Sequence, residues 1–216
     1  MNISKVEVEG MVNQIEKAVA FWNWFKEHAQ KYIAFHQIEV GAKMELIDQF
    51  SEKIREYHPC ISFRMGGAKD AEITEIILSA NGQKLYFDAV YILGSVAPEF
   101  DGIKVITFAP PVGTKFKFFY RGHEFNSTKT VFFPVVSPEK SNFVGLDVCH
   151  KDYTEEEHEM FIAATWKMLQ GLLGEKSAAM DIDYMKVSKK PKKKDRSNAL
   201  PFTEIGAYID VKKDRV

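Results

Sequence analysis

Apolar residues recur with helical spacing in three long stretches of the chain. In the first, residues 11–36, a spacing of three, four and seven residues predicts the buried face of an amphipathic helix. The members of that face are Val12, Ile15, Val19, Trp22 and Ala29, with Phe21, Phe25 and Tyr32 beside them. A second helix is predicted over residues 42–57. A third follows the capping box of Thr154 and Glu157 and ends before Gly174.

Between these helices the period changes to two, which predicts strands. The expected strands are residues 60–65, 72–80, 83–87, 103–108, 115–120, 130–136, 142–149 and 178–185, with a short helix over 88–94 and a closing helix or turn over 201–210. Asn81-Gly82 supplies the two positive φ angles of a type I′ turn, so it predicts an antiparallel hairpin at the middle of the chain. No internal repeat is visible in the sequence.

Runs of strands and runs of helices are segregated along the chain, which favours an α+β fold. We expect a mainly antiparallel, twisted sheet of about six to eight strands. The two N-terminal helices and the helix over residues 155–173 are predicted to pack on one face of it. The whole chain, residues 1–216, is expected to form a single domain with a flexible basic segment at 186–198.

Composition is that of an ordinary globular protein. The chain has 216 residues, 45% of them hydrophobic, and a net charge of −1, so bulk charge draws it neither to nucleic acid nor to a membrane. The first residues lack the apolar stretch of a signal peptide, and no apolar run approaches the roughly 20 residues of a membrane helix. Cys60 and Cys149 lie in apolar strands and predict buried thiols in a reducing compartment. We therefore expect a cytoplasmic protein.

Motifs for catalysis are missing from the sequence. It has no G-x-S-x-G nucleophile elbow, and its paired glycines lack the lysine and serine or threonine of a phosphate-binding loop. The six histidines do not have the spacing of a zinc site. We predict no catalytic residue, no metal and no cofactor, while an unrecognised enzyme stays an alternative.

Candidate partner-binding or ligand-binding residues are chosen by position, because loops on a rigid sheet concentrate function. They are Trp24, Glu27, Arg64, Glu99, Asp101, Arg121, His123 and Glu175. Trp24 lies beside the apolar stripe of its predicted helix and is therefore a candidate interface anchor. Core packing is the alternative for this tryptophan.

The segment 186–196 is the most basic part of the chain, with seven cationic residues in eleven. Its candidate polyanion-binding residues are Lys189, Lys190, Lys192, Lys193 and Lys194. Such a run attracts phosphate because binding releases counterions, so RNA, DNA or an acidic protein could be its ligand. No aromatic residue is interleaved, which argues against base stacking. The alternative is a soluble connector that its own repulsion keeps extended.

Five short motifs carry a family resemblance. They are Phe21-Trp22-x-Trp24-Phe25, Pro59-x-x-Ser-Phe63, Ala97-Pro98, Phe108-x-Pro110 and Leu173-Gly-Glu175. Over most of residues 20–182 the chain resembles a bacterial family classed as a domain of unknown function. The resemblance implies a bacterial, cytosolic, single-domain protein and names no catalytic residue, cofactor or substrate. Some members are joined to domains similar to regulators of ribonuclease activity.

We predict a non-catalytic, protein-binding or regulatory domain. RNA or polyanion binding through residues 186–196 is the alternative, and an unrecognised enzyme is the third. We expect a protein partner and no membrane partner. The sequence leaves the oligomeric state open.

Overall fold

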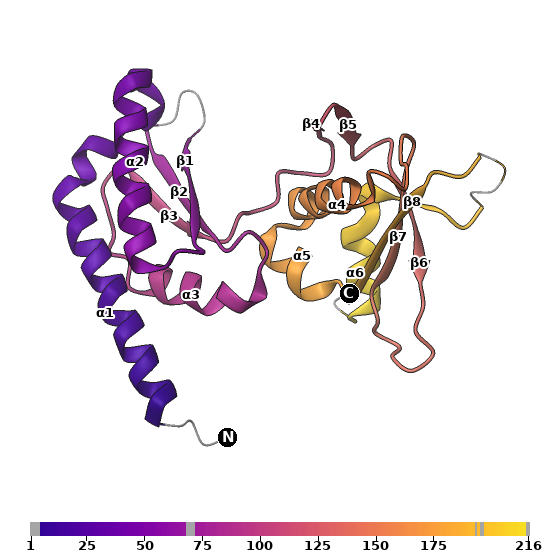
Figure 1. The fold of residues 1–216 in the computed structure, drawn as a ribbon, viewed down its shortest axis with the longest axis horizontal. Helices are drawn as coiled ribbons and strands as arrows, with labels where there is room; N and C mark the ends of the chain where they lie inside the picture. Colours follow the sequence, from indigo (N-terminus) through magenta and orange to yellow (C-terminus); the bar gives the residue numbers. More distant parts are fainter. Residues whose placement is uncertain (1–4, 68–71, 193, 195–196, 215–216) are drawn as a thin grey trace. The chain divides into compact units, whose positions relative to one another are not determined.

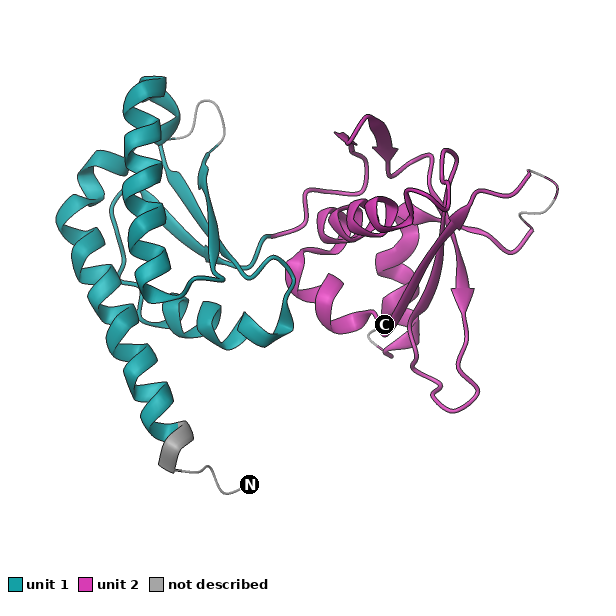
Figure 2. Cartoon of the chain, in the orientation of Figure 1, with its two compact units in different colours: residues 1–109 teal, residues 110–216 magenta. Residues whose placement is uncertain are grey.

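The chain folds into two compact units, residues 1–109 and 110–216, coloured separately in Figure 2. They are seen in a computed structural model, which describes residues 5–67, 72–192, 194 and 197–214. This division differs from the single domain that the sequence predicts. Each unit contains both a sheet and helices, so each can bury an apolar sheet face with its own elements.

Unit 1, residues 1–109, begins with two helices. These are α1 (Lys5–His28) and α2 (Val40–Tyr57), joined through the 3-10 turns Ala29–Tyr32 and Phe35–Gln37. Next along the chain are β1 (Ser62–Gly66), β2 (Thr74–Ser79), the 3-10 turn Lys84–Tyr86, α3 (Phe87–Ser95) and β3 (Ile103–Thr107) (Figure 1). The sheet has the order β1-β2-β3, with β2 antiparallel to β1 and parallel to β3.

Unit 2, residues 110–216, contains a separate two-stranded sheet and a four-stranded sheet. The first sheet is β4 (Lys117–Tyr120) and β5 (His123–Asn126). The remaining elements are β6 (Val131–Val135), β7 (Gly145–His150), α4 (His158–Leu173), α5 (Glu175–Asp181), β8 (Tyr184–Lys189), β9 (Leu200–Pro201), the 3-10 turn Phe202–Glu204 and α6 (Ile205–Lys212). The four-stranded order is β8-β7-β6-β9, and only the β7–β8 pair is parallel.

Both units share one connectivity. In each, two antiparallel strands are followed by helix and then by a third strand that lies parallel to the second: β1-β2-α3-β3 in unit 1, and β6-β7-α4-α5-β8 in unit 2. This ββαβ repeat is invisible in the sequence because the connecting helices and loops differ in length and composition. The α+β class and the predominance of antiparallel pairing are confirmed, but the strands form three sheets and not the expected single one.

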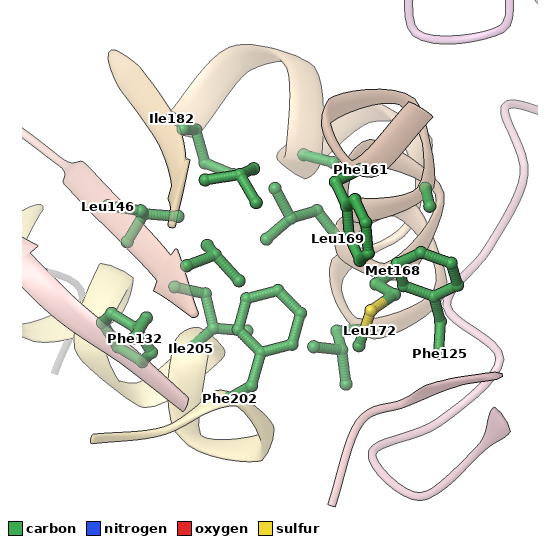
Figure 3. Packing of buried hydrophobic residues seen from close by; sticks show 14 of the residues in the cluster. Phe125, Phe132, Leu146, Phe161, Met168, Leu169, Leu172, Ile182, Phe202 and Ile205 are labelled. Carbon is green, nitrogen blue, oxygen red and sulfur yellow. The ribbon is translucent and has the colours of Figure 1, made fainter. Parts of the chain in front are cut away.

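The core of unit 2 lies between one face of its four-stranded sheet and the helices α4 and α6 (Figure 3). Phe132, Leu146 and Ile182 belong to the same buried cluster as Phe161 and Leu169 of α4. Residues Leu146 and Val148 are two apart on β7, so they share a face of the strand. The β4–β5 hairpin adds Phe125 to the same cluster.

In unit 1 only the second half of the predicted apolar face of α1 is buried. Phe21, Trp22 and Phe25 are buried, and the Trp22 indole donates a hydrogen bond to the Leu93 carbonyl at 2.7 Å. The predicted face also includes Val12, Ile15 and Val19, all of which are exposed. Spacing alone shows that a helix has an apolar stripe, but it does not show which part of the stripe other elements reach.

The Asn81-Gly82 turn forms, but the predicted hairpin does not. Both residues have positive φ, 53° and 76°, and the Gln83 amide donates to the Ala80 carbonyl at 3.0 Å. The chain then enters a 3-10 turn and α3, where Phe87, Val90 and Leu93 are buried at helical spacing. The strand β2 therefore pairs with β1 on one side and with β3 on the other. The second strand of the predicted hairpin, residues 83–87, is helical.

The tight two-residue hairpin of this chain lies instead at Arg121-Gly122. These residues have φ values of 46° and 87°, and they connect paired Tyr120 and His123. Two consecutive positive φ angles are what a type I′ turn requires. The strand β5 is not among the strands predicted from the sequence, because an arginine at the first turn position is a weak turn signal.

The predicted strand over residues 178–185 is also wrong. Its first half is the helix α5, and β8 begins only at Tyr184. The expected flexible segment 186–198 consequently starts inside the sheet, where Lys186 pairs with Asp147 of β7. Among the cysteines, Cys149 is buried and Cys60 is half-buried, and both are free thiols.

Gly145 is predicted to be intolerant of a side chain. A Cβ there would lie 2.6 Å from the Val135 carbonyl oxygen and 2.5 Å from a ring carbon of Phe143. Because backbone cannot move aside cheaply, Gly145→Ala should destabilise the protein by about 2 kcal/mol in urea unfolding. Gly10→Ala is the matched control: its Cβ meets nothing within 4 Å, and it should stabilise by about 0.5–1 kcal/mol. Equal effects of the two changes would contradict this.

Candidate functional site

A cavity of about 510 Å³ lies in unit 2 at one end of its four-stranded sheet. Here β7 and β8 end, β6 begins, and β5 contributes His123, Glu124 and Asn126. The cavity is lined by three lysines, two histidines and two acids, among others: Lys129, Lys151, Lys190, His123, His150, Glu124 and Asp152. A concave site of this volume suits a small ligand or one unit of a larger one.

His150 is the buried polar group of the cavity. It ends β7 and is only 6% exposed, and its Nε2 lies 2.7 Å from the hydroxyl oxygen of Thr165. That hydroxyl donates its hydrogen to the Phe161 carbonyl at 2.7 Å, so Nε2 of His150 must be the donor in their contact. Burial, and then the charge of Lys190, lower the pKa of His150 to about 4. The ring is therefore neutral at pH 7, with its lone pair on Nδ1.

His123 is placed at the cavity by the β4–β5 hairpin. Its Nε2 lies 3.1 Å from an oxygen of Glu157, and its ring meets the ring of Phe161 edge-on at 5.2 Å. Glu157 immediately precedes α4, so the contact joins the hairpin to the start of that helix. Thr154, whose hydroxyl lies 3.4 Å from Glu157, belongs to the predicted capping box, although α4 begins only at His158.

The lysines of the cavity come from three separate loops. Lys129 follows β5, Lys151 follows β7 and Lys190 follows β8. The backbone amide of Lys190 donates to the His150 carbonyl at 2.8 Å, and its ammonium donates to the Lys129 carbonyl. These two contacts hold the basic segment against the cavity at Lys190.

The charge balance of the lining is positive. Glu124 lies 3.2 Å from Lys129 and 3.6 Å from Lys117, and the hydrogen bond from Lys129 is the main cause of its lowered pKa. One carboxylate is thus matched by two ammonium groups. Among the described lining residues, Asp152 is the other acid, and Lys151 and Lys190 are the other lysines. The lining therefore keeps an excess of positive charge, which favours an anionic ligand.

Cys149 lies next to His150 but does not have the environment of a nucleophile. Its sulfur is 3.3 Å from the Ser188 hydroxyl, and burial is the main cause that raises the pKa of the thiol. The Ser188 hydroxyl in turn donates to Asp147 at 2.6 Å. A thiol with a raised pKa is mostly protonated at pH 7 and reacts slowly.

In unit 2 the structure brings together two of the residues chosen from the sequence, His123 and Lys190, at one cavity. Arg121 is exposed in the hairpin turn, with its guanidinium 5.7 Å from the centre of the Tyr120 ring. Glu175 is only 1% exposed at the first position of α5, so it is not a surface contact.

The basic segment is only partly organised around the cavity. Lys189 is the exposed last residue of β8, and Lys192 and Lys194 are exposed beyond it. Lys193 lies outside the described residues. Lys186 is paired with Asp147 at 3.0 Å, and a hydrogen bond to this acid raises its pKa, so its charge is already matched.

In unit 1 the chosen residues do not converge on one site. Trp24 is half-buried, stacks on His28 at 5.1 Å and lines a shallow cavity of about 310 Å³. Glu99 lines a different cavity, of about 420 Å³. Glu27, Arg64 and Asp101 are exposed.

Sequence reasoning misses His150, Thr165, Lys129 and Lys151 as site residues. The one available signal is that the apolar strand Val148-Cys149 ends in His150-Lys151-Asp152. A strand that ends in polar residues is a common place for a site. The sequence does not show which other loops meet that strand end.

Comparisons with known proteins return no family model, no curated protein and no solved structure that matches this chain. The family resemblance drawn from the five motifs stays a prediction. Within the described ranges, no group of three or more histidine, cysteine, aspartate or glutamate residues is placed to hold a metal ion. No helix in the part of the chain that the structure describes is long and apolar enough to cross a membrane.

Proposed function

We propose that unit 2 binds a phosphate-rich polyanion, single-stranded RNA, at the lysine-lined cavity. The observation that supports this is the convergence of Lys129, Lys151 and Lys190, from three loops, on one concave surface. Exposed Lys189, Lys192 and Lys194 extend the positive charge beyond the cavity. A ligand with successive phosphates can contact both parts.

Binding, without catalysis, is the function that the local chemistry favours. With a pKa of about 4, His150 is a weak base at pH 7, whereas a general base works best with a pKa near the operating pH. The adjacent Cys149 has a raised pKa. We also propose, as the sequence predicts, that the protein is cytoplasmic and has a regulatory role.

The proposal is tested by fluorescence anisotropy with a labelled oligouridylate at a series of KCl concentrations. The triple change Lys129→Gln, Lys151→Gln, Lys190→Gln should weaken binding about tenfold or more and reduce the salt slope by about 2, since each phosphate contact contributes about 0.7. The matched control changes Lys26, Lys31 and Lys84, exposed lysines of unit 1, to glutamine.

The two triple variants carry the same change of net charge, so a general charge effect would lower both affinities equally. That result, or wild-type affinity in the cavity variant, would contradict the proposal. Thermal melting of each variant shows whether the loss of the Lys190 contact to the Lys129 carbonyl disturbs the fold.

Protein binding is the second candidate. It is favoured by a row of apolar side chains that α1 leaves exposed, Val8, Met11, Val12, Ile15 and Val19. Rows of this kind at helical spacing are typical of helices that pack on another polypeptide.

A further inference from the structure

The first half of α1 is apolar on one side, and the described residues of unit 1 leave that side exposed. Five side chains are 38–49% exposed: Val8, Met11, Val12, Ile15 and Val19. Figure 1 shows the first turns of α1 extending past the other elements of unit 1. From Ala18 onward one face of the helix is packed, and Phe21, Trp22 and Phe25 are buried. The exposed row, hereafter the α1 seam, therefore lies mostly before the part of the helix that holds the core.

The α1 seam has the spacing of a coiled coil. Val8, Val12, Ile15 and Val19 are separated in turn by four, three and four residues, which is the alternation of d and a positions in a heptad. Val12 and Val19 take the a positions, and Met11 widens the seam at g. On a helical wheel the centre of the seam lies about a third of a turn from the midpoint of Phe21 and Phe25. The next d position of the same heptad is Trp22, which is buried, so the seam runs into the core at its C-terminal end.

The seam is costly to leave in water. Five large side chains at this exposure present an apolar strip on the order of 400 Å², comparable to the largest patch of a typical monomer, which is often functional. A helical stretch of this length is also only marginally stable without tertiary contacts. Both considerations predict that another apolar surface covers the seam.

We propose that a second copy of this chain covers the α1 seam, through a parallel pairing of α1 with α1. A second copy supplies the same heptad in the same register, so that each apolar residue of the seam meets its own counterpart. Two such strips remove about 800 Å² of apolar surface, less than the roughly 1,200 Å² at which standard specific interfaces begin. The dimer is therefore weak, with a dissociation constant on the order of micromolar.

Charge selects the parallel arrangement. Glu9 and Glu16 occupy e positions of the heptad. In an antiparallel pair e faces e, so Glu9 of one copy meets Glu16 of the other, and like charges repel. In a parallel pair e faces g, so Glu16 lies beside Met11 of the second copy and no like charges meet.

The test is analytical ultracentrifugation of the full chain from about 1 to about 200 μM, a range that brackets a micromolar constant. The wild type should shift from monomer to dimer with concentration. Val12→Glu should weaken association at least tenfold, because it buries an unpaired charge at the seam. The matched control is Asn13→Glu, which puts the same charge on the opposite, exposed side of the helix and should associate like the wild type.

If the wild type stays monomeric throughout the concentration range, the proposal is overturned. This holds even if another part of the same chain covers the seam. Equal loss of association in both variants overturns it as well. Circular dichroism of both variants should retain wild-type helicity, because Val12 is exposed in unit 1. Neither result depends on RNA, so this proposal and the cavity proposal fail independently.

Orientation is tested with Val8→Cys under mild oxidation. In the parallel pair the two residues at this d position face one another, so a disulfide-linked dimer should form above the level of the wild type. In the antiparallel pair residue 8 faces Val19 of the second copy, and the two cysteines are then separated by roughly three helical turns. No added cross-linking would overturn the parallel arrangement.

Discussion

Replacing Phe161 by alanine should lower the free energy of unfolding by about 3–5 kcal/mol. Its ring, on α4, is 1% exposed and lies within 5.5 Å of four other rings, measured between centroids: His123, Phe125, His150 and Tyr153. Without this ring, His123 and Phe125 of the β4–β5 hairpin lose a packing partner, and so does His150 at the end of β7. The cavity left behind adds to the lost transfer free energy because a close-packed interior collapses only partly.

Urea unfolding followed by far-UV circular dichroism measures this change. The matched control is Phe119→Ala on β4, where the ring is 70% exposed and the expected effect is below about 0.5 kcal/mol. A loss below about 1 kcal/mol for Phe161→Ala would mean that the ring is not the centre of this cluster. RNA binding should also weaken in the Phe161 variant, since Phe161 supports both histidines of the cavity.

Protonation of His150 should cost the protein about 3 kcal/mol of stability as the pH falls from 7 to 4. Burial lowers its pKa from 6.5 to about 4 in the folded state. Between these two values the unfolded chain binds the proton and the folded chain does not. Lowering the pH therefore favours the unfolded state, and the stability returns as the pH rises above about 6.5.

The contribution of His150 is isolated by comparison with His150→Gln, whose amide can still donate to the Thr165 hydroxyl but does not titrate. The difference in unfolding free energy between the two proteins should change steeply between pH 4 and 6.5. It should be constant at higher pH. NMR titration of the imidazole should give a midpoint near pH 4. Parallel pH profiles for the two proteins would rule out the assigned pKa.

The sequence predicts those elements whose conformation depends on the spacing of side chains close together along the chain. α2 and α4 follow from apolar spacing, and β1, β3, β6 and β7 follow from alternation. The Asn81-Gly82 turn is likewise local, because its φ angles depend on those two residues alone. The element after that turn is decided by distant contacts: residues 87–95 form the helix α3, which contacts α1 and β2, and Phe87, Val90 and Leu93 are buried in it.

The candidate site shows the same limit. His123 and Lys190 can be selected from the sequence as exposed or basic residues, but their proximity cannot. Lys129, Lys151 and Lys190 are up to 61 positions apart along the chain, and the order β8-β7-β6 is what brings their loops to one end of the sheet. Likewise, the pKa of His150 follows from burial, which no residue type carries by itself.

The sequence by itself determines the α+β class, most of the helices and strands, and the excess of lysine at one place in the chain. Only the tertiary structure decides that there are two units, that the apolar stripe of α1 is split between a buried and an exposed face, and that three lysine loops share a cavity. The physical reason is that secondary structure reflects the periodicity of neighbouring side chains, whereas burial and proximity depend on which distant elements pack together.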